Sequence, residues 1–320
     1  MCLIMNLIKS NGNKFIFLFL LIVIGHYNLF SQDNKTTDCN KIVLEADSLF
    51  NKVGNLKKSI LLYTQAYYEC GNKEIEFNLS KAHALLGNKD SAFYHLNNVF
   101  EKDSTSELFD VGEYYLLIKD KRWEKVIDKQ LDKIQAKSGK IKKIDLAKRL
   151  IDMRIKDQSY YYYIAKLPYN KELEHKYWPI KNKINKKNLK ELREIILENG
   201  GWPKISEVSS KVSGAAFLII QHSEPQTMQL YYSYLKECVE EGEAEKRHLA
   251  LMTDRMISNL GVKQIYGTQI SFDEKTGVYY LDLNEVIDPI NLNKRRAEMD
   301  LKPIEEYLKN WNAELRNIPK

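Results

Sequence analysis

The sequence predicts a mainly α-helical protein, in which helical hairpins precede an α-rich domain with one small β-hairpin. Three observations lead to this prediction. The 320 residues are 44% hydrophobic and 29% charged with only 14 glycines, a composition typical of a globular chain that buries a sizeable core. A repeat with an offset of 33 residues runs through the first half. A segment rich in β-branched and aromatic residues occurs once, near the C-terminus.

The N-terminus has the pattern of a secretory signal peptide. Lys9 and Lys14 precede ten consecutive apolar residues, 15–24, which are too few for a membrane span of about 20. We place cleavage after Ser31 and expect residues 1–31 to be removed, which leaves no stable membrane span; an uncleaved anchor is the alternative. The protein is therefore expected to be exported, to the periplasm or beyond the cell.

Export places the cysteines in an oxidising compartment. After loss of Cys2, three remain, Cys39, Cys70 and Cys238. Cys39 is expected at the entry of one helix and Cys70 at the exit of its antiparallel partner, so we predict that these two form a disulfide. Two unrelated buried thiols are the alternative. Cys238 is expected in the middle of a helix, where we interpret it as a packing residue.

The 33-residue repeat matches residues 46–70 to residues 79–103, with Gly54 aligned to Gly87 at a turn between helices. A weaker third copy lacks the turn glycine and has Lys121 instead. This pattern resembles the tetratricopeptide repeat over residues 40–138, which implies a short stack of helical hairpins. Such stacks usually bind a protein or peptide, although three copies could serve only to support the following domain. The paired positions are Phe50 with His83, Ser59 with Ala92, Tyr63 with Leu96 and Ala66 with Val99, and the third copy continues with Tyr114, Leu117, Trp123 and Val126.

Basic residues concentrate between the repeats and the C-terminal domain. Residues 119–149 contain 12 Lys or Arg and 5 Asp or Glu, and residues 166–194 contain 9 and 4. In the first stretch, acids recur every four residues beside lysines, which indicates a solvated helix face rather than binding of a polyanion. The net charge of +6 is also too small to favour nucleic acid as a partner. We interpret residues 139–200 as a helical connector, with a loop at Pro168 and Pro179 before a helix over 187–199.

Residues 201–320 are expected to form the compact second domain. Glycine and proline at 200–203 end the preceding helix, and an apolar helix then reaches Gln221 and His222. Two more helices follow, over 226–241 and 244–260, and residues 264–272 and 278–283 form the β-hairpin. A last helix is expected over 303–315.

Several motifs of this region resemble, in order, the bacterial domain of unknown function 6624. The resemblance covers about residues 143–318 and names no reaction. It departs from the family pattern at Asp300, where glycine is expected before Leu301. The residues that carry it are Asp157 and Gln158, Gly201 to Pro203, Gln221 and His222, Asp254 and Arg255, Gln264, Tyr266 to Gln269, Arg295 and Arg296, and Leu301 with Pro303.

Polar residues of these motifs form the candidate site. In a catalytic interpretation, His222 paired with Asp254 is a general base, and Arg255 or an arginine at 295 or 296 binds an anionic group. In a structural interpretation, the same groups fix the hairpin onto the helices, because buried polar groups need partners. The sequence leaves both open. The candidate catalytic residues are His222, Asp254 and Arg255, and the candidate ligand-binding residues are Gln221, Gln264, Tyr266, Gln269, Arg295 and Arg296.

The chain lacks the spacings of common metal, redox, phosphate-loop and serine-nucleophile motifs, so no cofactor and no metal is expected. The function predicted from the sequence is an exported module that binds a protein or peptide through its repeats. The alternative is an extracytoplasmic hydrolase-like enzyme with a His, Asp and Arg centre.

Overall fold

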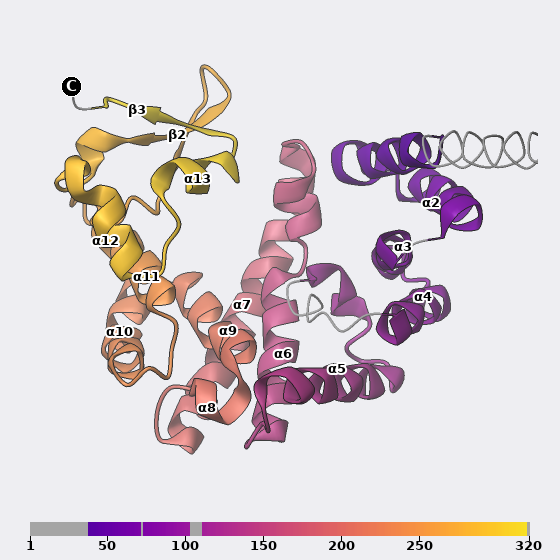
Figure 1. Cartoon of the computed structure of the whole chain (residues 1–320), viewed down its shortest axis with the longest axis horizontal. Helices are drawn as coiled ribbons and strands as arrows, with labels where there is room; N and C mark the ends of the chain where they lie inside the picture. Colours follow the sequence, from indigo (N-terminus) through magenta and orange to yellow (C-terminus); the bar gives the residue numbers. More distant parts are fainter. Residues whose placement is uncertain (1–37, 72, 103–110, 319–320) are drawn as a thin grey trace, which may run out of the picture. The chain divides into compact units, whose positions relative to one another are not determined.

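The computed structural model describes residues 38–71, 73–102 and 111–318; the expected leader lies outside these ranges. The described residues divide into two compact units, the first up to residue 102 together with 166–169, and the second over 111–165 and 170–318. The prediction of a mainly α-helical protein with a small β element is confirmed (Figure 1). The units divide near residue 103, so the expected third repeat copy belongs to the second unit.

The first unit contains two helical hairpins. A helix over 38–48 continues into η1 (Leu49–Val53) and is followed by α2 (Leu56–Cys70), α3 (Lys73–Leu85) and α4 (Lys89–Lys102). Gly54 and Gly87, aligned in the repeat, both have positive φ, of 72° and 75°, and stand at the turns within the two hairpins. Only glycine adopts this left-handed conformation without a steric penalty. The hairpins occur where the repeat predicts them, and the tetratricopeptide identity stays a prediction.

Cys39 lies near the start of the first hairpin's first helix, and Cys70 is the last residue of its second helix, so both stand at the same end of the hairpin. Their Cα atoms are 6.4 Å apart, within the range that a disulfide spans, and the structure joins their sulfur atoms. Cys238 is buried and unpaired. Burial raises the pKa of the Cys238 thiol to about 11, which makes it a poor nucleophile at neutral pH.

The second unit is a bundle of helices followed by a small sheet. Its core helices α6 and α9 pack against each other, and α7 and α11 also contact α9 (Figure 1). The helices in chain order are η3 (Gly112–Leu116), α5 (Arg122–Ser138), α6 (Ile144–Gln158), η4 (Tyr162–Lys166), α7 (Lys171–Asn199), α8 (Ile205–Val208), α9 (Ser210–Gln221), α10 (Pro225–Glu240), α11 (Lys246–Ser258), η5 (Leu283–Glu285), η6 (Pro289–Asn291), α12 (Leu292–Glu298) and α13 (Ile304–Lys309).

Helix α7 begins 16 residues earlier than expected, at Lys171 rather than Lys187. The Asn170 side chain caps it by accepting hydrogen bonds from the backbone N–H groups of Glu172 and Leu173. Pro179 therefore lies inside the helix instead of in a loop. Proline removes one backbone donor, but the remaining turns keep their hydrogen bonds and their buried side chains. This longer helix carries a buried lysine, Lys181, into the centre of the unit.

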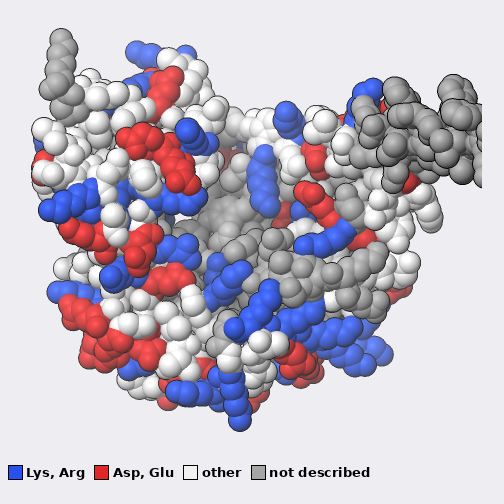
Figure 2. Space-filling view, viewed as in Figure 1, with Lys and Arg blue, Asp and Glu red and all other residues white. Residues whose placement is uncertain are grey.

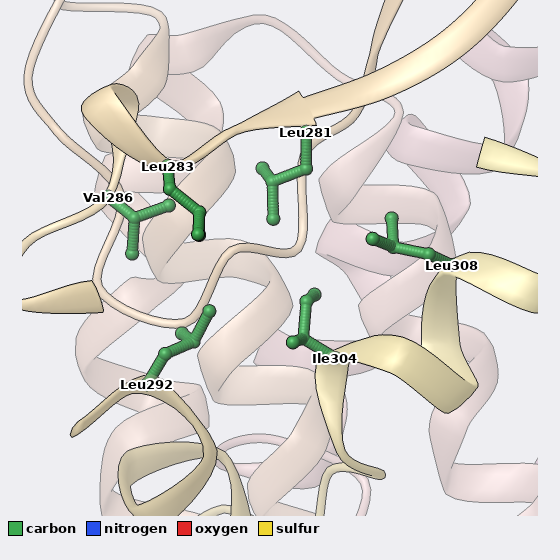
Figure 3. Packing of buried hydrophobic residues seen from close by; sticks show 6 residues of the cluster. All are labelled: Leu281, Leu283, Val286, Leu292, Ile304 and Leu308. Carbon is green, nitrogen blue, oxygen red and sulfur yellow. The ribbon is translucent and has the colours of Figure 1, made fainter. Parts of the chain in front are cut away.

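The sheet has three strands, β1 (Ser271–Asp273), β2 (Val278–Asp282) and β3 (Ala313–Arg316). β1 and β2 form the expected antiparallel hairpin, and β3 adds to β2 in parallel. The last helix therefore ends at Lys309, and residues expected to be helical form β3. Beneath the sheet a cluster of buried side chains comes from β2, from η5 and its C-cap, and from α12 and α13 (Figure 3). Its members are Leu281, Leu283, Val286, Leu292, Ile304 and Leu308.

A close backbone contact fixes the end of α6. A Cβ atom added at Gly112 would lie 1.9 Å from the carbonyl oxygen of Gln158, so only glycine permits this approach of η3. The chain then reverses at Tyr160, whose φ is 64°, and Tyr162 is buried in the next turn. The four tyrosines 160–163 thus follow the end of α6. The last turn of α6 carries Asp157 into the interior, where its side chain is 1% exposed.

Acidic and basic side chains are interspersed over much of the face drawn in Figure 2. This agrees with solvated helix surfaces for most of the charged residues. Among the residues that the structure describes, no helix combines the length and the apolar character that a membrane crossing requires.

Candidate functional site

His222 lies at the C-terminal cap of α9, and its side chain is 19% exposed. Its ring nitrogen Nδ1 is 3.0 Å from Oδ2 and 3.1 Å from Oδ1 of Asp157. Because a carboxylate only accepts, Nδ1 must carry the proton and donate. Nε2 is then the basic nitrogen, and no described residue forms a hydrogen bond with it. This is the arrangement of a histidine that a buried carboxylate orients as a base.

Asp157 is held from a second side by Lys181 of α7, which is fully buried. The Lys181 Nζ atom lies 3.8 Å from Asp157 Oδ1, donates to Asn185 Oδ1 at 2.6 Å, and sits 4.7 Å from the centre of the Tyr161 ring. Burial lowers the pKa of Lys181, and the charge of Asp157 counteracts that shift. Gln158 Nε2 also donates to Asp157 Oδ2, at 2.7 Å. Asp157 therefore has fixed donors on several sides.

Arg255 of α11 is a second cation near the site, and its side chain is half-buried. Its Nε atom donates to Gln269 Oε1 at 3.1 Å, and its Nη1 atom donates to the backbone oxygen of Gln221 at 2.9 Å. Both acceptors are neutral, and no ion pair of Arg255 with a described acid is present. Burial lowers the pKa of Arg255, whereas the nearby Tyr161 and Tyr307 raise it. The third nitrogen, Nη2, has no described partner, so a bound anion could use it.

Tyr161 connects these two parts. Its ring meets the His222 ring edge-on, with centroids 6.0 Å apart. Burial raises the pKa of Tyr161 to about 12; Asp157 raises it further and Arg255 lowers it. The hydroxyl is therefore neutral at physiological pH and can donate a hydrogen bond. We call Asp157, Tyr161, Lys181, His222 and Arg255 the His222 cluster.

Asp254 is not the partner of His222. It is fully buried and accepts hydrogen bonds from the backbone N–H groups of Ile265, Tyr266 and Thr268, at 2.8, 3.1 and 2.9 Å. The Thr268 hydroxyl donates to it as well, at 3.0 Å. These donors use the hydrogen-bonding capacity of the Asp254 carboxylate, and the hydrogen bonds fix the conformation of the loop over 265–268. Asp254 thus has the structural role of holding the loop. The carboxylate that pairs with His222 is that of Asp157.

Three other candidate residues also fasten this loop. Gln264 Nε2 donates to the backbone oxygen of Gln269 at 2.9 Å, and Gln264 Oε1 accepts from the Gln269 N–H at 2.8 Å. Arg295 Nε donates to the Ile265 oxygen at 2.9 Å, and Arg296 Nη1 donates to the Tyr266 oxygen at 2.6 Å. Arg296 is fully buried. Both arginines donate to backbone oxygens of this part of the chain, and Arg295 Nη1 also lies 3.5 Å from Asp288 Oδ2.

The candidate residues thus separate into two groups. The Gln221 backbone and the Gln269 side chain hold Arg255, whereas Tyr266 takes part through its backbone in the loop that Asp254 organises. Gln264 and Gln269 also line a cavity of about 350 Å³ at the end of α11. Its other walls are Ser258, Gly261, Val262, Ser271, Tyr280, Leu281, Asp282 and Glu285.

Three members of the His222 cluster, Asp157, Tyr161 and Lys181, were missing from the sequence-based site. Asp157 was assigned only to the helix that leads into the domain, and Lys181 fell in an expected loop. One signal was available for Asp157, because a charged residue on a buried helix face needs a partner. No comparable signal identified Lys181, since its helix was not predicted.

The family comparison covers the whole site. The model of a family of unknown function, DUF6624, matches residues 144–315, more than half of the chain. The protein belongs to this family, and the His222 cluster lies within the matched residues. No curated protein and no solved structure matches the chain. Within the described residues, no group of three or more His, Cys, Asp or Glu side chains is arranged to hold a metal ion.

Proposed function

We propose that the His222 cluster is the acid–base centre of a hydrolase-like enzyme that acts on an anionic substrate. One observation carries this proposal: Nδ1 of His222 is bound to buried Asp157, while Nε2 has no described partner and the side chain is partly exposed. A histidine that only stabilised the fold would be expected to use both nitrogens or to be sealed. General acid–base catalysis by such a residue typically contributes 10²- to 10⁴-fold to the rate.

Each residue of the cluster has a role in this proposal. His222 Nε2 takes a proton from a water molecule while the water oxygen bonds to the electrophilic atom of the substrate. The resulting imidazolium returns the proton to the leaving group, and Asp157 stabilises the charge in between. Arg255 Nη2 binds the anionic group of the substrate, because its charge has no carboxylate partner. Lys181 offsets the negative charge of Asp157 from the buried side.

A substrate-free experiment tests the base. Diethyl pyrocarbonate acylates an accessible, unprotonated imidazole nitrogen, and mass spectrometry locates the adduct. We expect His222 to be labelled at Nε2 in the native protein at pH 7, and an anionic ligand bound at Arg255 to protect it. If the native protein leaves His222 unlabelled while exposed His175 reacts, Nε2 is sealed and the proposal fails.

A kinetic experiment tests the roles. Hydrolysis of p-nitrophenyl acetate, which is neutral, is compared with that of mono-p-nitrophenyl succinate, which is anionic. We expect His222→Gln to abolish both activities, and Arg255→Gln to raise KM for the succinate ester alone. The matched control is His175→Gln, since His175 lies on the surface of α7 and bonds only to its own helix. Equal rates for His222→Gln and the control would contradict the proposal.

A second candidate function is the binding of a protein or peptide by the first unit, as the repeats predict. One observation favours it: Leu61 and Tyr68, seven residues apart on one face of α2, are 69% and 82% exposed. Large apolar side chains exposed together often mark a binding surface. Leu61→Ser with Tyr68→Ser should then abolish partner binding without lowering the melting temperature, and unchanged binding would contradict this function.

A further inference from the structure

One face of α7 is strongly basic. Lys183, Lys186, Lys187 and Lys190 are all exposed, and at 3.6 residues per turn they fall within an arc of about 100°. The buried residues of the same helix, such as Leu192, lie on the opposite side. The four lysines therefore form a single stripe, about 10 Å long at 1.5 Å per residue. We call them the lysine face of α7.

The charges of this face are not neutralised within the described part of the protein. None of its four lysines has an acidic oxygen within 4.0 Å, in contrast to Lys148, which lies 2.6 Å from Asp128. The nearest acids along the helix are Glu191, which lies 3.7 Å from Arg149, and Glu194, which ends the stripe. Residues 175–190 of α7 contain no acid, so the alternation of acids and bases that indicates a solvated face is absent along this stretch and resumes only at Glu191 and Glu194. Four adjacent positive charges without counter-charges repel one another and favour an anionic partner.

The surface beside these lysines is hollowed. A shallow, open concavity of about 380 Å³ lies along the lysine face, beside Pro179 and Asn182 of the same helix. A second cavity, of about 240 Å³, shares Lys187. Its apolar walls come from Tyr115, Ile118 and Ile184, and Lys119, Lys156, Asn188 and Glu191 complete it. A pocket with one apolar wall thus adjoins a row of cations.

We propose that the lysine face and the adjoining pocket bind an acidic segment of a protein partner. Aspartate or glutamate side chains one helical turn apart would lie opposite the lysines, whose rows repeat every three to four residues. One apolar side chain of the partner would enter the pocket at Ile118 and Ile184. This binding surface is independent of the His222 cluster and of its proposed chemistry.

Two features favour a protein segment over a polyphosphate or a nucleic acid. Polyphosphate has no apolar group to fill the pocket. The cations are all lysines, whereas phosphate recognition favours the bidentate geometry of arginine. Charge attraction of this kind accelerates association and weakens as salt is added. The affinity of the complex should therefore fall as ionic strength rises. The apolar contact should supply the part of the binding free energy that salt does not remove.

Fluorescence anisotropy tests the proposal with a labelled 15-residue helical peptide that carries glutamates at positions i, i+4 and i+7 and one leucine. We expect the peptide to bind the full chain at low salt and to bind at least about tenfold more weakly when all four lysines of the face are changed to glutamine. The matched control changes Lys148, Lys204, Lys236 and Lys302 to glutamine. It removes the same number of charges from lysines that pair with acids.

The remaining arms distinguish the class of partner. Ile118→Ser should weaken binding of the leucine peptide but not of the same peptide with alanine in place of leucine. Circular dichroism is used to check that each variant is folded. If the control variant loses as much affinity as the lysine-face variant, the attraction depends only on net charge and the proposal fails. It also fails if the peptide does not bind, or if polyphosphate of equal charge binds more tightly and Ile118→Ser has no effect.

Discussion

His222 Nδ1 lies 3.0 Å from Asp157 Oδ2, although the two residues are 65 positions apart in the chain. Helices α6 and α9 pack side by side and bring the end of one to the end of the other. Lys181, from a third helix, completes the buried charge pair. The site therefore depends on the mutual packing of three helices, and its stability and its function are coupled.

The buried charges at this centre should depend on each other. Asp157→Asn leaves Lys181 without a counter-charge in the interior, and we expect it to lower the free energy of unfolding by about 3 kcal/mol. Adding Lys181→Met removes the unpaired charge, so the double variant should be about 1 to 3 kcal/mol more stable than the sum of the single effects predicts. Urea denaturation measures all three variants. Strictly additive losses would show that the two residues do not interact.

Asp254 should affect stability through its loop. In Asp254→Asn, the new amide group faces backbone N–H donors that need an acceptor, and we expect a loss of about 3 kcal/mol on thermal or urea unfolding. Asp282→Asn is the control, because Asp282 accepts from the backbone of a nearby surface turn and should cost at most about 1 kcal/mol. Equal stability of Asp254→Asn and the control would mean that the loop does not need the carboxylate.

His248 should make the fold sensitive to acid. Its ring stacks on Phe217 with centroids 4.3 Å apart, and burial lowers the pKa of His248 to about 4, against a smaller opposing effect of Glu245. Between pH 6.5 and 4 the unfolded chain binds a proton that the folded chain does not, so stability must fall as the pH falls through this window. The loss should reach about 3 kcal/mol near pH 4.

Melting temperatures recorded from pH 7 to pH 4 check this effect. His248→Phe keeps an aromatic ring against Phe217 but cannot titrate, so its melting temperature should fall less over the same range. Parallel curves for the two proteins would assign the acid sensitivity to other groups.

The Cys39–Cys70 pair should form a disulfide when the protein is in an oxidising compartment. By loop-closure entropy, a bond across 31 residues contributes about 3 to 4 kcal/mol. Peptide mapping without reductant should find the two cysteines linked and Cys238 as a free thiol, and Cys39→Ala with Cys70→Ala should lower stability by that amount. Alkylation of all three cysteines without reductant would contradict both the disulfide and the oxidising compartment.

Most of the helices could be predicted because their ends are set by residues close by in the sequence. Gly54 and Gly87 mark turns through their own backbone conformation, and glycine at 200 ends α7 in the same way. The signals failed where a longer-range effect prevailed. Pro179 suggested a loop, but packing of the surrounding turns kept it helical, and residues 313–316 became a strand because β2 offered an edge.

The sequence by itself determined the class of fold, the family, and two members of the candidate site, His222 and Arg255. His222 and Arg255 could be named from the order of the motifs and from the chemistry of their side chains, both of which a single sequence shows. Only the tertiary structure decided that Asp157 and Lys181 surround His222 and that Asp254 serves the loop. Every residue except proline carries a backbone N–H, so no sequence pattern shows which of these donors a given carboxylate will accept from. The pairing of distant charges is likewise set by how helices pack, because packing alone brings their ends within hydrogen-bond distance.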